Sequence, residues 1–343
     1  MKTYRLEQTG NLDHLSLNQE PDPTPGPQDV VIRVRANALN YRDLMVMRGA
    51  YRVPPRPRVI PLSDGSGEVV AVGTGVKRFK VGDRVAGAFF QGWMGGHIAA
   101  EHLSTDLGGS IDGMLSEYVV LHEQGVVKIP SHLSFEEAAT LPCAAVTAWC
   151  CLTDQRQLMP GDTVLTLGSG GVSVFAMQFA RMFGARVIAT TSSDAKAEKL
   201  RALGAHDVIN YSTYPEWDQE VMRLTGRRGA DFVIEVGGPG TLACSLKSAA
   251  IGGHVVQVGI LGGVGQQLDP VLFRGRSITT RSITVGSRQS FEAMLRAIDV
   301  NQLRPVIDQV FHFDDAKLAY QHLQEQKHFG KVVINHPDRT MRV

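Results

Sequence analysis

The sequence predicts an α/β protein of two domains, one rich in strands and one built on a doubly wound parallel sheet. The chain has 343 residues, more than one ordinary hydrophobic core accommodates. Its first third consists of strand-like runs separated by turns. From about residue 134, short β-branched runs alternate with helical patterns, which is typical of parallel strands joined by helices.

The first third contains recognisable strands and loops. Residues 30–37 (VVIRVRAN) alternate between apolar and polar side chains, and residues 67–76 (GEVVAVGTGV) form a β run bounded by glycines. The proline-rich segments 21–29 and 53–61 lie between such runs, so we expect loops there. Residues 88–113 are rich in glycine, aromatics and histidine without periodicity, which predicts an ordered loop.

The second part begins with a capping box, Ser134 and Glu137, which predicts a helix running towards Trp149. Strands and helices then alternate: TVLTL, a helix to Phe183, RVIATT, a helix over AKAEKLRALGA, DVINY, a helix through WDQEVMRLTG, DFVIEV, a helix near 240–249, and HVVQVG. The chain ends in two helical patterns, FEAMLRAIDV and DAKLAYQHLQEQ, and the strand-like KVVI.

Composition excludes several classes of function. A formal net charge of +1 supplies no basic field for a nucleic acid. The four cysteines lack metal-site spacing, which favours reduced thiols in a reducing compartment. The chain starts without a signal-like apolar region, and no run reaches the roughly 18 apolar residues of a membrane span. We therefore expect a cytoplasmic protein that binds neither nucleic acid nor membrane.

A glycine-rich turn follows the predicted strand TVLTL. It reads Gly168-Ser169-Gly170-Gly171-Val172-Ser173, a dinucleotide fingerprint whose third glycine is replaced by serine. The first glycine permits the tight turn, the second lets the backbone approach the pyrophosphate, and the following helix N-terminus attracts phosphate. The third glycine mainly serves helix–strand packing, so Ser173 should not block the site. The turn predicts dinucleotide binding; a methyltransferase-like or empty site is the alternative.

The next strand predicts which nucleotide is bound. An NAD site places an acidic side chain about twenty residues beyond the glycines. Here Thr191, Ser192 and Ser193 occupy that region, and Lys196 follows. Hydroxyls and a lysine suit the 2′-phosphate of NADPH, so NADPH is favoured over NADH. Asp194 is the opposing observation, although it is expected to cap the next helix.

Several motifs, in order and spacing, resemble the zinc-independent, quinone oxidoreductase-like branch of the medium-chain dehydrogenase/reductase superfamily. They are GSGGV, VIATTSSDAK, LGAHDVINY, DFVIEVGG, GGHVVQVG, VGSR and GKVVI, and they span nearly the whole chain. The resemblance implies a GroES-like catalytic domain (1–130 and 286–343) around a Rossmann domain (131–285) with a six-stranded sheet. It also implies an active site in the cleft between the domains and, commonly, a homodimer.

The resemblance also indicates where zinc-dependent relatives hold their metal. Their first Cys falls on Asn40, their Gly-His-Glu on Leu62-Ser63-Asp64, and their third ligand on Cys143. Asn and Ser are poor zinc ligands, and Cys143 with Asp64 falls short of the three protein ligands of a catalytic site. We therefore expect no zinc. Cys143 is then either a small buried apolar residue or a thiol that lines the cleft.

No structural zinc is expected either. The relatives' structural-zinc lobe carries four cysteines, whereas residues 80–120 contain none. His97 and His102 are not spaced as a helical ligand pair.

Without a metal, oxidation of a simple alcohol loses its activation, and reduction of a conjugated C=C bond or a quinone becomes the easier chemistry. Such a site needs a polar group for the developing oxyanion and a proton donor. By resemblance, Tyr51 is the first candidate donor, and it could equally anchor the proline-rich loop. Asn40 and Tyr41 could bind the carbonyl oxygen, and the alternative for Asn40 is that it ties down a turn. Asp64, if buried, needs a cationic partner such as Arg42.

Other residues are placed around the site by resemblance. Phe89, Phe90 and Trp93 would cover the cleft, unless they serve ordinary packing. Tyr211 would lie against adenosine. The residues beside the nicotinamide would be Val258, Gly259, Ser287 and Arg288, with Arg288 a second phosphate or cofactor anchor. Arg52, Arg56 and Arg58 form a basic patch that is either solvated or attracts an anionic substrate.

The function predicted is an NADPH-dependent oxidoreductase acting on small carbonyl, enone or quinone substrates. Two alternatives stay open: a metal-free alcohol/aldehyde or acyl-CoA-type reductase, and an NADPH-binding protein without catalytic activity.

Overall fold

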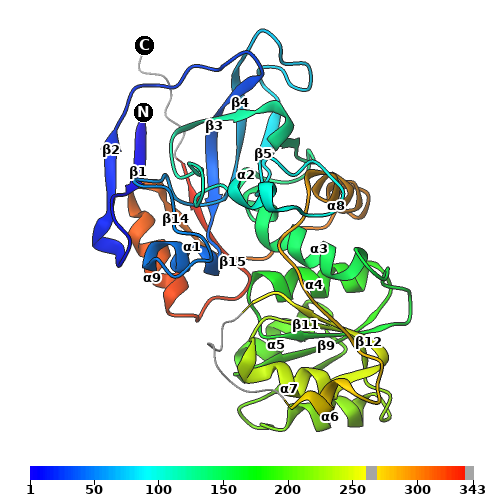
Figure 1. Cartoon of the computed structure of the whole chain (residues 1–343). Coiled ribbons are helices and arrows are strands. Elements are labelled where there is room, and N and C mark those ends of the chain that lie inside the picture. The colour runs from blue at the N-terminus through cyan, green and yellow to red at the C-terminus, as the bar shows by residue number, and fades with distance from the viewer. Residues whose placement is uncertain (260–268, 337–343) are drawn as a thin grey trace. The chain divides into compact units, whose positions relative to one another are not determined.

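The computed structural model describes residues 1–259 and 269–336, which form two compact units (Figure 1). Unit 1 comprises Met1–Val146 and Gly286–Val343, and unit 2 comprises Thr147–Val285. The sequence analysis placed the first boundary after residue 130 instead. The difference arises because helix α2 (Phe135–Ala139) packs on strands β3 and β4 of unit 1.

Unit 1 is built on a seven-stranded sheet in the order β14-β15-β3-β4-β5-β7, with β6 paired to β3. Strand β3 (Asp29–Ala38) is central: it pairs with β4 over most of its length, with β6 near its start and with β15 near its end. The other strands are β14 (Ile307–His312), β15 (Lys331–Asn335), β4 (Asp64–Val72), β5 (Arg84–Gly87), β7 (Val126–Lys128) and β6 (Tyr118–His122). A separate antiparallel pair is formed by β1 (Lys2–Leu6) and β2 (Leu15–Gln19).

The helices of unit 1 cover parts of this sheet. Helix α9 (Ala316–Gln324) packs on β14 and β15 and contacts α1 (Tyr41–Arg48), as Figure 1 shows. Helix α8 (Arg288–Asn301) contacts β7. The loop 88–113 contains only a short 3-10 helix, Ala100–Ser104, and isolated bridges. Among residues 1–259 and 269–336, no helix is long and apolar enough to cross a bilayer.

The helix predicted from Ser134 to Trp149 is interrupted. Ser134 and Glu137 form the expected capping box, but α2 ends at Ala139 and is followed by a π-helical turn, Leu141–Ala145. The prediction of one continuous helix is therefore wrong, and the reason is Pro142, which has no N–H for the helical ladder. The wide turn lets the backbone N–H of Cys143 donate outside the helix, to the Asp64 carboxylate.

Unit 2 contains the predicted parallel sheet of six strands in the order β10-β9-β8-β11-β12-β13. Its strands are β8 (Thr163–Leu167), β9 (Arg186–Thr191), β10 (Asp207–Asn210), β11 (Ala230–Glu235), β12 (Ala249–Gln257) and β13 (Thr279–Ser282). The order reverses between β8 and β11, which is where doubly wound sheets bind their ligands.

Helices cover both faces of this sheet. They are α4 (Gly171–Met182), α5 (Asp194–Ala202), α6 (Trp217–Leu224) and α7 (Pro239–Ser248), whereas α3 (Val146–Thr153) packs on α4 through Trp149 and Phe179. Figure 1 shows α4 on one face of the sheet and α6 and α7 on the other. The chain adds strands first on one side of β8 and then on the other, and right-handed connections in these two directions place their helices on opposite faces.

A buried histidine makes the stability of unit 1 sensitive to acid. The His336 Nε2 atom lies 2.8 Å from Asn37 Oδ1, and this oxygen must accept because Asn37 Nδ2 donates to the carbonyl oxygens of Asp64 and Met114. Burial, reinforced by the charge of Arg35, lowers the pKa of His336 to about 3. The unfolded chain therefore takes up a proton near pH 6.5 that the folded chain refuses, and stability falls as pH drops below that value.

We expect His336→Gln to reduce the loss of unfolding free energy between pH 8 and pH 5 by about 2 kcal/mol. The measurement is urea unfolding of variant and wild type at both pH values. The comparison with wild type is needed because Asp43, whose pKa burial raises to about 6, acts in the opposite direction over part of this range. His97→Gln, at an exposed histidine, is the control. Equal pH dependence of the His336 variant and wild type would contradict the prediction.

Candidate active site

Strand pairing in unit 1 gathers polar residues at the start of α1. Ala38, the last residue of β3, pairs with Asp64 on β4 and with Val333 on β15. Asn40, two residues after Ala38, caps α1, and Lys331 is the first residue of β15. Because β15 runs antiparallel to β3, this register brings Lys331 opposite Asn40. Four distant segments therefore meet here, with the turn that carries Cys143 as the fourth.

Lys331 is the cation at the centre of this cluster. Its side chain is 3% exposed, and Nζ donates to Asn40 Oδ1 at 2.5 Å and to the carbonyl oxygen of Leu39 at 2.7 Å. Nζ also lies 3.8 Å from Asp64 Oδ2. An ammonium group can only donate, so it fixes which end of the Asn40 amide is the oxygen.

Asp64 is completely buried and surrounded by donors. Ser63 Oγ donates to Asp64 Oδ1 at 2.8 Å, and the Cys143 N–H donates to Oδ2 at 3.3 Å. Burial raises the pKa of Asp64, and Lys331 is the largest of the groups that partly offset this rise. The cluster therefore holds a carboxylate whose charge is balanced mainly by one lysine.

The expected partnership of Arg42 with Asp64 is wrong. Arg42 Nη2 donates to Asp106 Oδ2 at 2.6 Å, and Nη1 donates to the carbonyl oxygen of Leu107 at 2.8 Å. The guanidinium also lies over the ring of Tyr51, 4.6 Å from its centroid. Arg42 thus ties α1 to the loop 106–107, and the β15 register supplies Asp64 with Lys331 instead.

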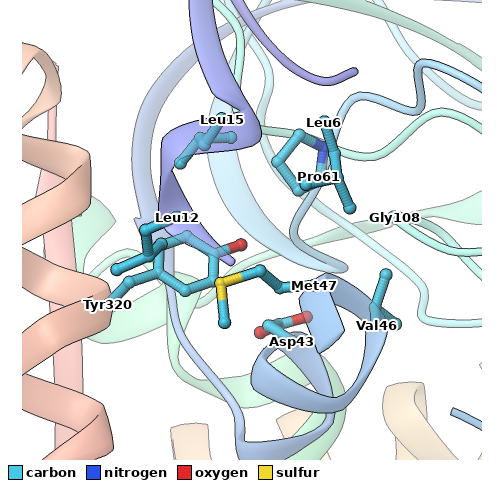
Figure 2. Close-up of a pocket in the computed structure, with 9 residues that line it drawn as sticks. All are labelled: Leu6, Leu12, Leu15, Asp43, Val46, Met47, Pro61, Gly108 and Tyr320. Atoms are coloured by element: carbon cyan, nitrogen blue, oxygen red, sulfur yellow. The ribbon is translucent and has the colours of Figure 1, made fainter. Parts of the chain in front are cut away.

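Asp43 links this cluster to a small internal cavity. Its Oδ2 accepts from the backbone N–H of Asn40 at 2.8 Å, whereas Oδ1 makes no hydrogen bond among the described residues but lies 3.5 Å from Arg42 Nη1 as an ion pair. Figure 2 shows Asp43 and Tyr320 among the residues lining a cavity of about 10 Å³. That volume is close to the minimum for one water molecule.

Tyr51 and Tyr41 both lie partly buried against the core of unit 1. The Tyr51 ring lies under the guanidinium groups of Arg42 and Arg52, with the Arg52 carbon 5.4 Å from its centroid. Burial raises the pKa of the Tyr51 phenol, although both arginines oppose the rise. The phenol is therefore protonated at neutral pH, as a proton donor must be.

Cys143 stands beside the same cluster. Its side chain is partly exposed, and burial raises the pKa of the thiol well above its ordinary value, with the charge of Asp64 adding to the rise. Such a thiol is neutral and a weak nucleophile. None of the four cysteines, all of which lie in the described part of the chain, forms a disulfide.

The aromatic residues expected at the cleft are packed within unit 1. Phe89 lies under Arg42, and Phe90 makes edge contacts with both Phe89 and Trp93. Trp93 stacks on His102 and donates through Nε1 to the carbonyl oxygen of Gly96. These contacts are ordinary core packing, and a role for Phe89 or Trp93 in binding substrate stays a prediction.

The basic patch is largely neutralised. Arg58 pairs with Glu7 at 2.6 Å, and Arg56 pairs with Asp112 at 3.3 Å. Arg52 instead lies over the rings of Tyr51 and Phe90.

The residues at the start of α1 do not fit a zinc ion. Asn40 Oδ1 and Asp64 Oδ2, the oxygen ligands that zinc could recruit here, both face the Lys331 ammonium. Across the described ranges, no group of three or more His, Cys, Asp or Glu side chains could hold a metal. These residues therefore do not supply the roughly three protein ligands that a catalytic zinc needs.

We therefore expect the purified protein to contain no stoichiometric metal and to keep its activity in the presence of a chelator. Elemental analysis measures the first and turnover after EDTA dialysis the second. One tightly held zinc per chain, with activity lost to the chelator, would overturn the expectation.

In unit 2, the glycine turn lies at the end of β8, beside the point where the strand order reverses. Gly168 has φ +72°, and Gly170 is the N-cap of α4. A Cβ atom added at either glycine would meet no atom within 4 Å, so there is open space above the turn. Ser173 is buried, and its Oγ donates to the carbonyl oxygen of Leu167 at 2.6 Å. The turn, which continues through Gly171 and Val172, therefore fits a dinucleotide phosphate.

The helix that follows β9 is capped by a different residue from the one expected. Ser193, not Asp194, caps α5: its Oγ accepts from the N–H of Lys196 at 3.3 Å. Asp194 is the first helical residue and accepts from Asn210 Nδ2 at 2.8 Å. Because Ser193 already caps the helix, the Asp194 carboxylate is available to accept the hydrogen bond from Asn210. Thr191 Oγ1 is buried without a hydrogen-bond partner in the described residues, and Ser192 is exposed.

Further predicted cofactor residues lie on both units. In unit 2, the N–H of Tyr211 donates to the carbonyl oxygen of Thr191, and those of Val258 and Gly259 donate to that of Glu235. In unit 1, Ser287 caps α8. Arg288 donates to Gln124, so its guanidinium is already engaged. The cofactor roles of all five stay predictions.

Glu235, a residue not predicted to be functional, is completely buried at the end of β11. Its Oε1 accepts from the N–H groups of Gly237 and Gly238 and from Thr241 Oγ1, and its Oε2 accepts from Ser245 Oγ. The carboxylate thus fixes the turn that leads into α7 at the carboxyl edge of the sheet. An acidic residue at the end of the buried strand DFVIEV was the available signal.

Comparisons with known proteins agree with this architecture. Residues 26–131 match the family model of the alcohol dehydrogenase GroES-like domain, and residues 171–299 match that of the zinc-binding dehydrogenases. A zinc-type alcohol dehydrogenase-like protein of Schizosaccharomyces pombe is 41% identical over 90% of this chain and 91% of its own. The chain belongs to the medium-chain dehydrogenase/reductase superfamily.

Within the superfamily, this member falls in the quinone oxidoreductase-like branch. A quinone oxidoreductase of Pseudomonas aeruginosa is 33% identical over 90% of this chain and 92% of its own. The crystal structure of an NAD-dependent alcohol dehydrogenase superimposes with a TM-score of 0.89 at 35% identity, covering 98% of this chain and 99% of that one. This dehydrogenase/reductase is thus an oxidoreductase of a family that binds nicotinamide cofactors and acts on small molecules.

Proposed function

We propose that the protein is a zinc-independent, NADPH-dependent reductase of α,β-unsaturated carbonyl compounds or quinones. The observation that carries the proposal is the polar cluster at the start of α1. It offers hydrogen-bond donors and a lysine ammonium, where a metal-dependent relative would need three ligands. Such a cluster can meet negative charge on an oxygen but cannot activate an alcohol as a Lewis acid would.

In the proposed reduction, a hydride adds to the β-carbon of an enone, the C=C electron pair moves to form an enolate, and a proton completes the saturated ketone. A bound nicotinamide supplies the hydride. The residues of unit 1 then have two tasks, to stabilise the enolate oxygen and to deliver the proton. The Asn40 amide suits the first task, and the protonated Tyr51 phenol suits the second, with Tyr41 in reserve.

The relatives support the reaction class more firmly than the cofactor. The Pseudomonas aeruginosa relative is named a quinone oxidoreductase, whereas the similar crystal structure is named NAD-dependent. Preference for NADPH rests on this chain's own residues: Thr191, Ser192 and Ser193, followed by Lys196, with no acid at the end of β9. We also propose a cytoplasmic homodimer, as the resemblance implies.

The proposed function is tested with a panel of enones, quinones, aldehydes and simple alcohols, following the absorbance of NADPH in the presence of EDTA. We expect turnover of enones or quinones and slow oxidation of ethanol or benzyl alcohol. The relatives named alcohol dehydrogenases favour a second candidate, a metal-free alcohol/aldehyde dehydrogenase. Rapid oxidation of simple alcohols would establish it, and tight NADPH binding without any turnover would mark a non-catalytic protein.

A further inference from the structure

The cluster contains a buried amide donor that the surrounding protein groups do not fully satisfy. Asn40 is 8% exposed, and its Nδ2 atom makes no well-formed hydrogen bond in the described part of the chain. A weak hydrogen bond from the Asn40 side chain helps to hold down the pKa of the Asp64 carboxyl, and it can occupy at most one of the two Nδ2–H groups. A buried N–H group without a well-formed hydrogen bond is costly, so the second Nδ2–H group of Asn40, at a candidate active site, suggests a ligand as its partner.

The other end of the same amide is held by a charge. Lys331 Nζ donates to Asn40 Oδ1 at 2.5 Å and to the Leu39 carbonyl oxygen at 2.7 Å. Rotation of the amide by half a turn would place its NH₂ group against the ammonium, donor against donor, which the pair cannot adopt. The contact therefore fixes the direction of the Nδ2–H bonds, and the cation draws electron density from the amide and makes these bonds stronger donors.

We infer that Lys331 is a positioning residue that acts through Asn40, orienting and polarising its amide so that Nδ2–H donates to the oxygen of the substrate on which negative charge develops. The inference rests on the proposed function for the identity of that oxygen. Lys331 itself does not contact the substrate. Its charge, held in place by Asp64, performs the electrostatic task that a metal performs in a zinc-dependent relative.

The test uses the charge-balanced variant Lys331→Met/Asp64→Asn, because Lys331→Met alone leaves Asp64 buried without its cation and risks misfolding. Losing one oriented donor to an oxyanion costs about 10²–10³-fold in kcat, so we expect a fall of at least about tenfold for an enone, with KM nearly unchanged. Lys327→Met removes an exposed lysine nearby and should leave kcat unchanged.

A double-mutant cycle separates positioning from a general loss of structure. In an Asn40→Ala background, Lys331→Met/Asp64→Asn should cost less than about twofold in kcat, because its route of action is already gone. Equal losses in both backgrounds would overturn the inference, since Lys331 would then act independently of Asn40. An unchanged kcat in the wild-type background would overturn it as well.

A second readout does not depend on activity. In protein labelled with ¹⁵N at asparagine, the side-chain amide signals of Asn40 are assigned by their loss in Asn40→Ala. We expect these signals to shift in Lys331→Met/Asp64→Asn and not in Lys327→Met. If the wild type reduces no enone or quinone, the proposed function fails, and the signals alone decide whether Lys331 orients Asn40. Unshifted signals contradict the inference, whatever the protein's activity.

Discussion

Replacing Tyr51 by phenylalanine is expected to lower kcat for an enone by at least about tenfold, because general acid catalysis typically contributes about 10²–10⁴-fold. The change removes only the hydroxyl. The ring and its contacts with the guanidinium groups of Arg42 and Arg52 stay in place, so little loss of stability is expected. The loss on a quinone should be smaller, since the quinol dianion can take its protons from water. Steady-state kinetics on both substrate types measures the difference.

Tyr41→Phe is the matched control for this prediction, because Tyr41 is also partly buried against the core of unit 1 and begins α1 beside Asn40. If Tyr41→Phe abolishes enone turnover while Tyr51→Phe leaves it unchanged, the donor is Tyr41. If neither change matters, the proton comes from water or from another group, and the role assigned to Tyr51 is wrong.

Lys196→Ala should weaken NADPH binding by roughly ten- to a hundredfold, the value of about 1.5–3 kcal/mol for one charge-assisted contact to phosphate. NADH lacks the 2′-phosphate, so its dissociation constant should change by less than about twofold. Lys196 belongs to the first turn of α5, where the Ser193 cap fixes the backbone next to the end of β9. Titration of both cofactors by fluorescence provides the comparison.

Lys199→Ala is the control for the cofactor prediction, because Lys199 lies on the same helix near its last turn. Equal weakening of NADPH and NADH by Lys196→Ala would remove the basis for NADPH preference. Tighter binding of NADH than of NADPH by the wild-type protein would contradict the predicted preference directly.

The parts of the fold that depend on local pattern could be predicted from the sequence. Alternation of apolar and polar residues predicted β3, and short apolar runs between helical patterns predicted the parallel strands. The phosphate-binding turn after β8 was predicted because its glycines lie between a strand and a helix. The boundary near Val146 could not be predicted, because it depends on how α2 packs on β3 and β4. Pro142 could have predicted the break in the helix, but the residues around it have a helical pattern that favoured one continuous helix.

The candidate site was predicted only where a family motif marked it. Asn40, Asp64 and Cys143 do lie together in unit 1. Lys331 was missed because its contact with Asn40 spans 291 positions of the sequence and depends on the pairing of β15 with β3. A lysine opening the apolar strand KVVI was the only local signal. The same long-range register explains why Arg42 was assigned to Asp64 incorrectly.

The most direct test of the proposed reaction is to determine which carbon atom of an enone receives the hydride. The protein, with its metal content measured beforehand, is given an enone and NADPH carrying deuterium at the reactive position of the nicotinamide, and the product is analysed by mass spectrometry and NMR. The account predicts a saturated ketone with deuterium on the β-carbon, formed by protein that contains no stoichiometric zinc. An allylic alcohol with deuterium on the carbinol carbon, or product formed only when zinc is bound, would contradict it.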